Sequence, residues 1–124
     1  MALTTLIASD VTVLSAYRFG GTSGKQRKIV TVKLNDPLAT SGGMTIGANT
    51  GDIAASVLGF TKIEWCSALH VYTTSTGAPV GIFPAAPDLA GTSILTNDVT
   101  SASPAPSDVT ITTAQSAKIT LIGY

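Results

Sequence analysis

Cys66 and His70 are the two side chains whose types could support nucleophilic catalysis, in which an imidazole activates a cysteine thiolate. They lie four residues apart in an alternating stretch, so on a strand they would share a face with Cα atoms about 13 Å apart. A thiolate–imidazole hydrogen bond spans only about 3 Å, and the chain has no second Cys or His. We therefore expect that the protein is not an enzyme and that Cys66 is a small buried hydrophobe without a disulfide partner.

Ligands for metals and phosphates are equally sparse. A structural zinc site takes four Cys- or His-type ligands, and the sequence holds two such residues. Asp88, Asp98 and Asp108 lack the regular spacing of a calcium-binding loop, so we expect them to lie in turns and loop tips. Residues 20–25 (GGTSGK) lack the spacer and the final Ser or Thr of a phosphate-binding loop, and we interpret them as a hairpin turn. The sequence predicts no cofactor and no metal.

The charge balance limits the classes of partner. Seven Lys and Arg residues balance seven Asp and Glu residues, and only 11% of the chain is charged, against about a quarter in typical proteins. A net charge of zero gives no long-range attraction to nucleic acid or to an acidic membrane, and weak repulsion favours assembly. No stretch approaches the roughly 20 apolar residues of a membrane span, and the N-terminus lacks the basic region of a signal peptide. We expect protein partners, no nucleic acid, no membrane, and synthesis in the cytoplasm.

The positive charges are concentrated in one part of the chain. Five of the seven basic residues lie between Val11 and Asn35 with no acid among them: Arg18, Lys25, Arg27, Lys28 and Lys33. If the strands on either side of the Gly-rich turn pair, this basic hairpin has a positive surface. Two interpretations stay open: a docking surface for an acidic partner, or an edge hairpin whose charges prevent edge-to-edge aggregation. Nucleic acid fits less well, because few aromatic residues are interleaved with the charges.

The elements that must position these residues are mostly strands, since β-branched residues dominate and long helical stripes are missing. Strands are expected over residues 10–19, 25–35, 44–46, 61–73, 79–83, 109–113 and 117–122. One short helix is expected at about 52–58, with Asp52 at its start and Gly59 after its end. Residues 84–107, which contain four prolines, are expected to form a long loop. The pattern predicts a single all-β domain over residues 1–124, an antiparallel β-sandwich, jelly-roll-like fold or small barrel.

Alternation predicts which side chains form the core. The expected core anchors lie on two strands: Val30, Val32 and Leu34 on the first, and Ile63, Trp65, Leu69 and Val71 on the second. Trp65 would be the largest of them. In residues 10–19, Val11, Val13, Tyr17 and Phe19 are expected to share one face.

Three segments carry a resemblance to a known family: residues 28–34 (KIVTVKL), the paired-glycine loop 39–43 (ATSGG), and residues 57–65 (VLGFTKIEW). In these segments the chain resembles the small capsid decoration (cement) or head-stabilising proteins of tailed bacteriophages. The resemblance implies a β-rich virion structural protein, commonly trimeric, on the outer surface of the capsid. Its partners would be the major capsid protein and further copies of itself, and it would stabilise the shell by bridging capsomers.

Two segments are expected to attach the protein to the shell, because they are extended and poor in self-burial. These are residues 3–9, within a possible extended N-terminal arm over residues 1–9 and including Leu3, Leu6 and Ile7, and the basic hairpin with Arg18, Lys25, Arg27 and Lys28. Residues 84–107 are expected to contact neighbouring copies. The alternative is a receptor- or carbohydrate-binding β-sandwich module of a phage tail or adhesin. That alternative ranks second because Tyr17, Tyr72 and Tyr124 are scattered and Trp65 is expected in the core.

Overall fold

The computed structural model describes residues 5–20, 26–34, 44–97 and 106–124. The protein is all-β, and within these residues ten strands follow one 3-10 turn, η1 (Ala8–Asp10). All strand pairs are antiparallel. Over these residues there is no α-helix and no closed barrel. The same part of the chain contains no helix with the length and apolar character needed to cross a membrane.

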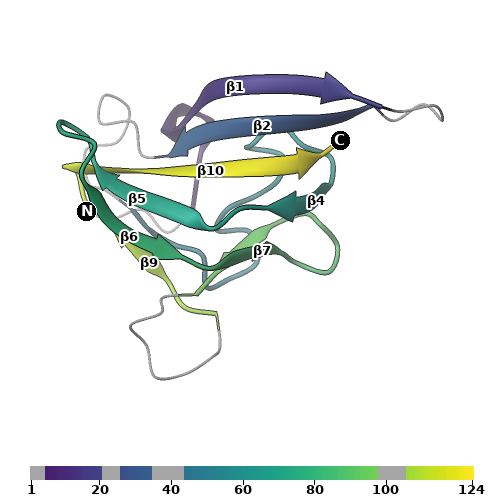
Figure 1. The fold of residues 1–124 in the computed structure, drawn as a ribbon. Coiled ribbons are helices and arrows are strands. Elements are labelled where there is room, and N and C mark those ends of the chain that lie inside the picture. Colours follow the sequence, from purple (N-terminus) through teal and green to yellow (C-terminus); the bar gives the residue numbers. More distant parts are fainter. Residues whose placement is uncertain (1–4, 21–25, 35–43, 98–105) are drawn as a thin grey trace.

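Six strands form the main sheet, drawn in Figure 1. Its order is β1 (Val11–Phe19), β2 (Arg27–Leu34), β10 (Gln115–Gly123), β5 (Leu69–Thr73) and β6 (Pro79–Phe83). A further strand, β4 (Ile63–Cys66), also pairs with β10. β4 and β5 follow one another along the same side of β10, because Cys66 pairs with Leu121 and Val71 pairs with Ala117. β10 is therefore the central strand, and β1 and β6 are the edges.

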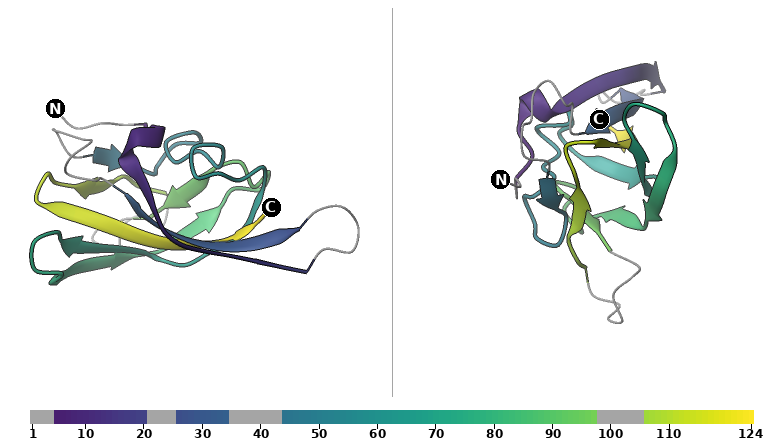
Figure 2. Two further views of the ribbon diagram at one scale, coloured as in Figure 1. Left: turned by 90° about the horizontal axis from the view of Figure 1, so that it is seen from above. Right: turned by 90° about the vertical axis from the view of Figure 1, so that its left-hand side faces the viewer.

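Two small sheets cover one face of the main sheet. One pairs β3 (Met44–Ile46) with β9 (Val109–Ile111), and the other pairs β7 (Ala85–Pro87) with β8 (Ile94–Thr96). Figure 2 shows both of them on the same side of the six strands. The side chains between the layers form one hydrophobic core, which includes Val32, Leu34, Met44, Ile46, Ile94, Val109 and Leu121. The opposite, outer face of the main sheet has no such cover from the described residues.

Most of the expected core anchors are buried, but the prediction for Trp65 was wrong. Six of them are at most 4% exposed: Val30, Val32, Leu34, Ile63, Leu69 and Val71. Trp65 is 50% exposed and pairs with Ile122 on the outer face. A bulge between Ile122 and Gly123 shifts the pairing with β4, so Cys66 takes the inward position instead.

Residues 61–73 form two strands rather than one. The interruption is at Ser67 and Ala68, between β4 and β5. There the Ser67 hydroxyl oxygen accepts a hydrogen bond from the Thr120 amide (3.0 Å), and the Ser67 amide donates to the Thr120 carbonyl (2.8 Å). These bonds keep Ser67 paired with β10, which continues as one strand past the interruption between β4 and β5.

The helix expected at 52–58 is replaced by successive turns. Hydrogen bonds of the 3-10 kind predominate there, such as Val57 N to the Ala54 carbonyl (3.2 Å) and Gly59 N to the Ser56 carbonyl (3.2 Å). The Asp52 carboxylate accepts from the amides of Gly47 (3.1 Å) and Asn49 (3.3 Å). Asp52 therefore closes the preceding loop instead of capping a helix that follows it.

The expectation of one long loop over residues 84–107 also needs correction, because the hairpin of β7 and β8 lies within it. Asp88 holds the connecting turn by accepting from the amides of Thr92 (2.9 Å) and Ser93 (3.3 Å). Asp108 accepts from the Ala48 amide (3.0 Å), while Asp98 lies outside the described residues. The expected turn-forming role of Asp88 is confirmed, and Asp108 ties its segment to the loop after β3.

Candidate functional site

Cys66 and His70 do not share a face of the sheet. Cys66 is buried beside Leu121, whereas His70 is exposed and pairs with Lys118 on the outer face. Burial raises the pKa of the Cys66 thiol to about 11. Among the described residues, no group of three or more His, Cys, Asp or Glu side chains could hold a metal ion.

The raised pKa of Cys66 gives a prediction for stability at high pH. The folded protein holds the thiol proton more tightly than the unfolded chain, whose Cys pKa is near 9.0. The protonated thiol therefore contributes fully to the free energy of unfolding below pH 9. This contribution, at most about 3 kcal/mol, is lost as the pH rises through about 11. Urea unfolding at pH 8 and pH 11 should show that the free energy of unfolding falls more between these pH values for the parent chain than for Cys66→Ala. Equal losses in both chains would contradict the prediction, since other titrating groups are common to both.

The basic hairpin forms, but its charges do not make one positive surface. β1 and β2 pair antiparallel, with Arg18 opposite Lys28 and Phe19 opposite Arg27. Arg18 and Lys28 therefore share one face, while Arg27 and Lys33 lie on the other. Lys25, also expected here, lies outside the described residues.

Two of these cations are engaged within the molecule. The Arg27 guanidinium donates two hydrogen bonds to the Glu64 carboxylate (2.8 and 3.2 Å), which raises the pKa of Arg27 and lowers the pKa of Glu64. The Lys28 ammonium donates to the Gly59 carbonyl and lies 4.6 Å from the centroid of the Phe60 ring. Of the expected attachment cations that the structure describes, only Arg18 projects into solvent with no contact of this kind shown.

The N-terminal segment is only partly available as an attachment arm. Leu6 is 1% exposed and belongs to the core, and its amide donates to the Asp52 carbonyl (2.8 Å). The expectation that Leu6 contacts a partner is therefore wrong. Ile7 is half-exposed and remains a candidate, while Leu3 lies outside the described residues.

The outer face of the main sheet carries an apolar strip that we call the aromatic row: Tyr17, Ile29, Ile122 and Trp65. The strand registers place these four side by side, Tyr17 opposite Ile29, Ile29 opposite Ile122, and Ile122 opposite Trp65. At about 4.8 Å between strands the row is roughly 14 Å long. Its two aromatic ends are the most exposed, Tyr17 at 68% and Trp65 at 50%. The row is an apolar strip across four strands, bordered by the Arg27–Glu64 ion pair.

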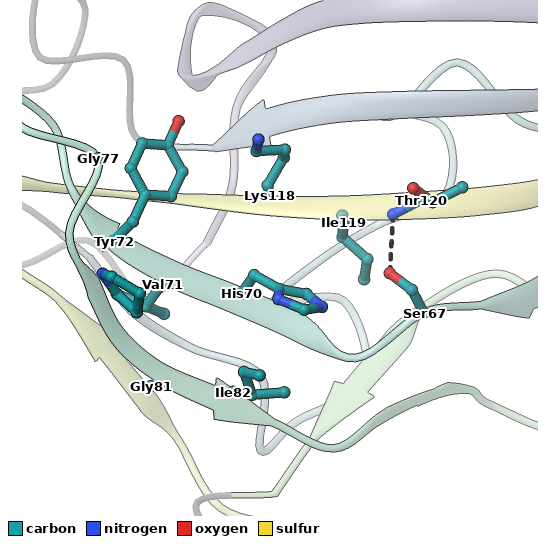
Figure 3. Close-up of a pocket in the computed structure, with 11 residues that line it drawn as sticks. Ser67, His70, Val71, Tyr72, Gly77, Gly81, Ile82, Lys118, Ile119 and Thr120 are labelled. Carbon is teal, nitrogen blue, oxygen red and sulfur yellow. Dashed lines mark hydrogen bonds between the residues drawn. The ribbon is translucent and has the colours of Figure 1, made fainter.

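A shallow depression of about 580 Å³ lies on the same face, over β5, β6 and β10. Figure 3 shows His70, Tyr72, Lys118 and Ile82 around it, with the Ser67–Thr120 hydrogen bond at one end. The Lys118 ammonium lies 5.5 Å from the centroid of the Tyr72 ring. No carboxylate is among the lining residues, so the depression is mildly positive.

Bulges explain why the sequence did not reveal this face. In β1 the register shifts between Val13 and Ser15, so Tyr17 lies on the opposite face from Val11 and Val13. The expectation that these residues share a face was therefore wrong, as it was for Trp65. A Thr31–Thr120 pair (3.0 Å between hydroxyl oxygens) lies between the aromatic row and the Lys33 and Lys118 positions, and Thr120 also lines the depression. The outer face is the candidate site.

Comparison with protein-family models, with curated proteins and with solved structures found no match to this chain.

Proposed function

We propose that the protein is a virion structural protein that binds the outer surface of a phage capsid through the outer face of its main sheet. The observation that carries the proposal is the aromatic row. Large, rigid aromatic side chains on an exposed surface are typical of the energetic centres of protein interfaces. In the free protein Tyr17 and Trp65 leave half or more of their surface in water, and a partner would remove that cost. The sequence resemblance to capsid decoration proteins supports the same proposal.

Within this proposal, the fold is a β-sandwich of jelly-roll type, with the main sheet facing the shell and the small sheets facing solvent. The shell partner is the major capsid protein, and bound copies also contact one another. A protein that binds the expanded shell more tightly than the unexpanded one stabilises the expanded form by that difference in affinity. Several linked copies that span neighbouring capsomers multiply weak individual contacts.

The test is co-sedimentation with intact particles from the source of the chain, with the copy number measured per major shell subunit. A regular ratio, lost after mild chaotrope treatment while the shell stays intact, is the expected result. A few copies per particle would place the protein at a tail or vertex instead. Absence from particles would overturn the proposal.

A receptor- or carbohydrate-binding module is the second candidate, and one finding favours it. Trp65 is exposed rather than buried, and Tyr72 lines the depression beside His70 and Lys118. Aromatic rings with neighbouring polar groups suit a sugar ring, which is apolar on one face and hydroxylated at its edge. Binding on a glycan array that disappears in Tyr72→Ala would establish this candidate.

A further inference from the structure

We propose that β1 pairs along its outer edge with β1 of a second copy, so that two main sheets join into one continuous sheet. The inference deepens the proposed function by naming a surface through which copies associate. It concerns the free protein, so it can be tested without particles.

β1 is a long edge strand that gains little burial in the single chain. It ends the strand order of the main sheet, and no other described strand pairs with it than β2. Figure 1 shows it along the top of the sheet with no ribbon beyond it. Val13, Leu14 and Tyr17 are 58%, 48% and 68% exposed, and residues 13–18 are exposed on both faces of the strand. Such an edge presents backbone donors and acceptors to any strand that can approach it.

The usual protections of an edge strand are weak in β1. Residues 15–19 contain no proline, and Arg18 is their one charge. The bulge between Val13 and Ser15 lies to one side of them, so residues 15–19 form a regular stretch. The other edge, β6, has five residues, starts with Pro79 and contains Gly81, both unfavourable for strand addition. β1 is therefore the edge that better accepts a further strand.

The regular stretch is complementary to itself. An antiparallel, two-fold pairing centred on Tyr17 places Tyr17 opposite Tyr17 of the second copy. It also places Ala16 opposite Arg18, and Ser15 opposite Phe19, so no like charges face each other. Each pair matches residues of the same sheet face, as β pairing requires. Alternate pairs exchange two hydrogen bonds, which gives roughly four to six across the five pairs.

The same pairing joins the two aromatic rows. Tyr17 ends the row in each copy, so the joined row runs from Trp65 of one copy through both tyrosines to Trp65 of the other. Facing aromatic residues on neighbouring strands add to sheet stability. A two-fold contact of this kind closes on itself, whereas pairing of β1 with β6 of the next copy would give an open filament. The absence of net charge removes repulsion between copies.

Sedimentation velocity of the full chain, diluted from about 100 µM to about 1 µM, tests the proposal in the range expected of a small interface. The expected result is a dimer that dissociates on dilution. Ala16 is exposed, so two opposite substitutions can be made there without disturbing the core. Ala16→Arg would place an arginine opposite Arg18 at two symmetric positions and weaken the dimer by roughly threefold to thirtyfold. Ala16→Glu would place a glutamate there and strengthen the dimer by a similar factor.

The double variant Ala16→Arg with Arg18→Glu should restore the dimer, because the introduced arginine at position 16 then faces a glutamate at position 18 of the other copy. A chain that is monomeric at all concentrations, a trimer indifferent to these changes, or equal effects of Ala16→Arg and Ala16→Glu would overturn the proposal. If Ala16→Arg failed to fold, Ala16→Glu would still have to strengthen the dimer, and Ala16→Glu combined with Arg18→Glu, which places like charges opposite each other, would have to weaken it. A monomer that binds particles would refute this inference and leave the proposed function in place. A dimer that is absent from particles would support this inference and overturn the proposed function.

Discussion

Trp65→Ala should lower the affinity of the chain for intact particles by at least about tenfold, since tryptophans that become buried in interfaces are common hot spots. The indole is half-exposed in the free protein and lies beside Ile122 on the outer face. Contact with a shell would bury the rest of it. The measurement is a co-sedimentation titration with purified particles. Because Trp65 is the only tryptophan, a blue shift of its fluorescence on binding would report the same burial directly.

Leu89→Ala is the matched control for this change. Leu89 is a fully exposed apolar residue between β7 and β8 and is not part of the aromatic row. Its removal takes away a similar amount of exposed apolar surface and should leave particle binding unchanged. Equal losses for both variants, or no loss for Trp65→Ala, would contradict the assignment of the outer face. Trp65→Ala should also lower the free energy of unfolding by only about 1–2 kcal/mol, because half of the side chain is already in water.

The sequence predicted side-chain faces correctly where the strands are regular. β2 pairs with β1 on one side and with an unbroken stretch of β10 on the other, and Val30, Val32 and Leu34 all face the core as alternation requires. The strand positions at 44–46 and 79–83 were also predicted correctly. These strands have the periodicity and turn residues that local physical rules detect.

The errors in side-chain faces have one physical cause. A bulge adds a residue to one strand and moves every following side chain to the opposite face. Neither the bulge after Val13 nor the one beside Trp65 contains a glycine in β1 or β4 that would signal it. The aromatic row depends on both bulges. It could not be found by counting alternate residues along each strand.

Other errors arise from contacts between distant residues. The sequence located the basic residues, but it could not show that Arg27 pairs with Glu64, which is 37 positions away. Asp52 has the residue type and position of a helix cap. Its carboxylate binds the Gly47 and Asn49 amides, which the fold brings to it from the preceding loop. Local preference was overridden in both cases by long-range geometry.

Gly47→Ala should lower the free energy of unfolding by roughly 2–5 kcal/mol, the sum of backbone strain and overpacking. Gly47 has φ of +115°, and an added Cβ would lie 1.8 Å from the Thr96 hydroxyl oxygen. Thr96 is 1% exposed, and its amide donates to the Gly47 carbonyl (2.9 Å), so neither residue can easily move away. Chemical denaturation at neutral pH would measure the loss.

Gly51→Ala separates the two causes of this loss. Gly51 also has a positive φ, +97°, but an added Cβ would meet nothing within 4 Å. It should therefore cost only the strain, about 1–2 kcal/mol. Equal losses for the two variants would mean that Thr96 yields and that the contact between the loop after β3 and strand β8 is loose. A larger loss for Gly47→Ala would show that this contact fixes the layer behind the main sheet. Because that layer lies on the far side of the core from the aromatic row, Gly47→Ala protein that remains folded should still bind particles, in contrast to Trp65→Ala.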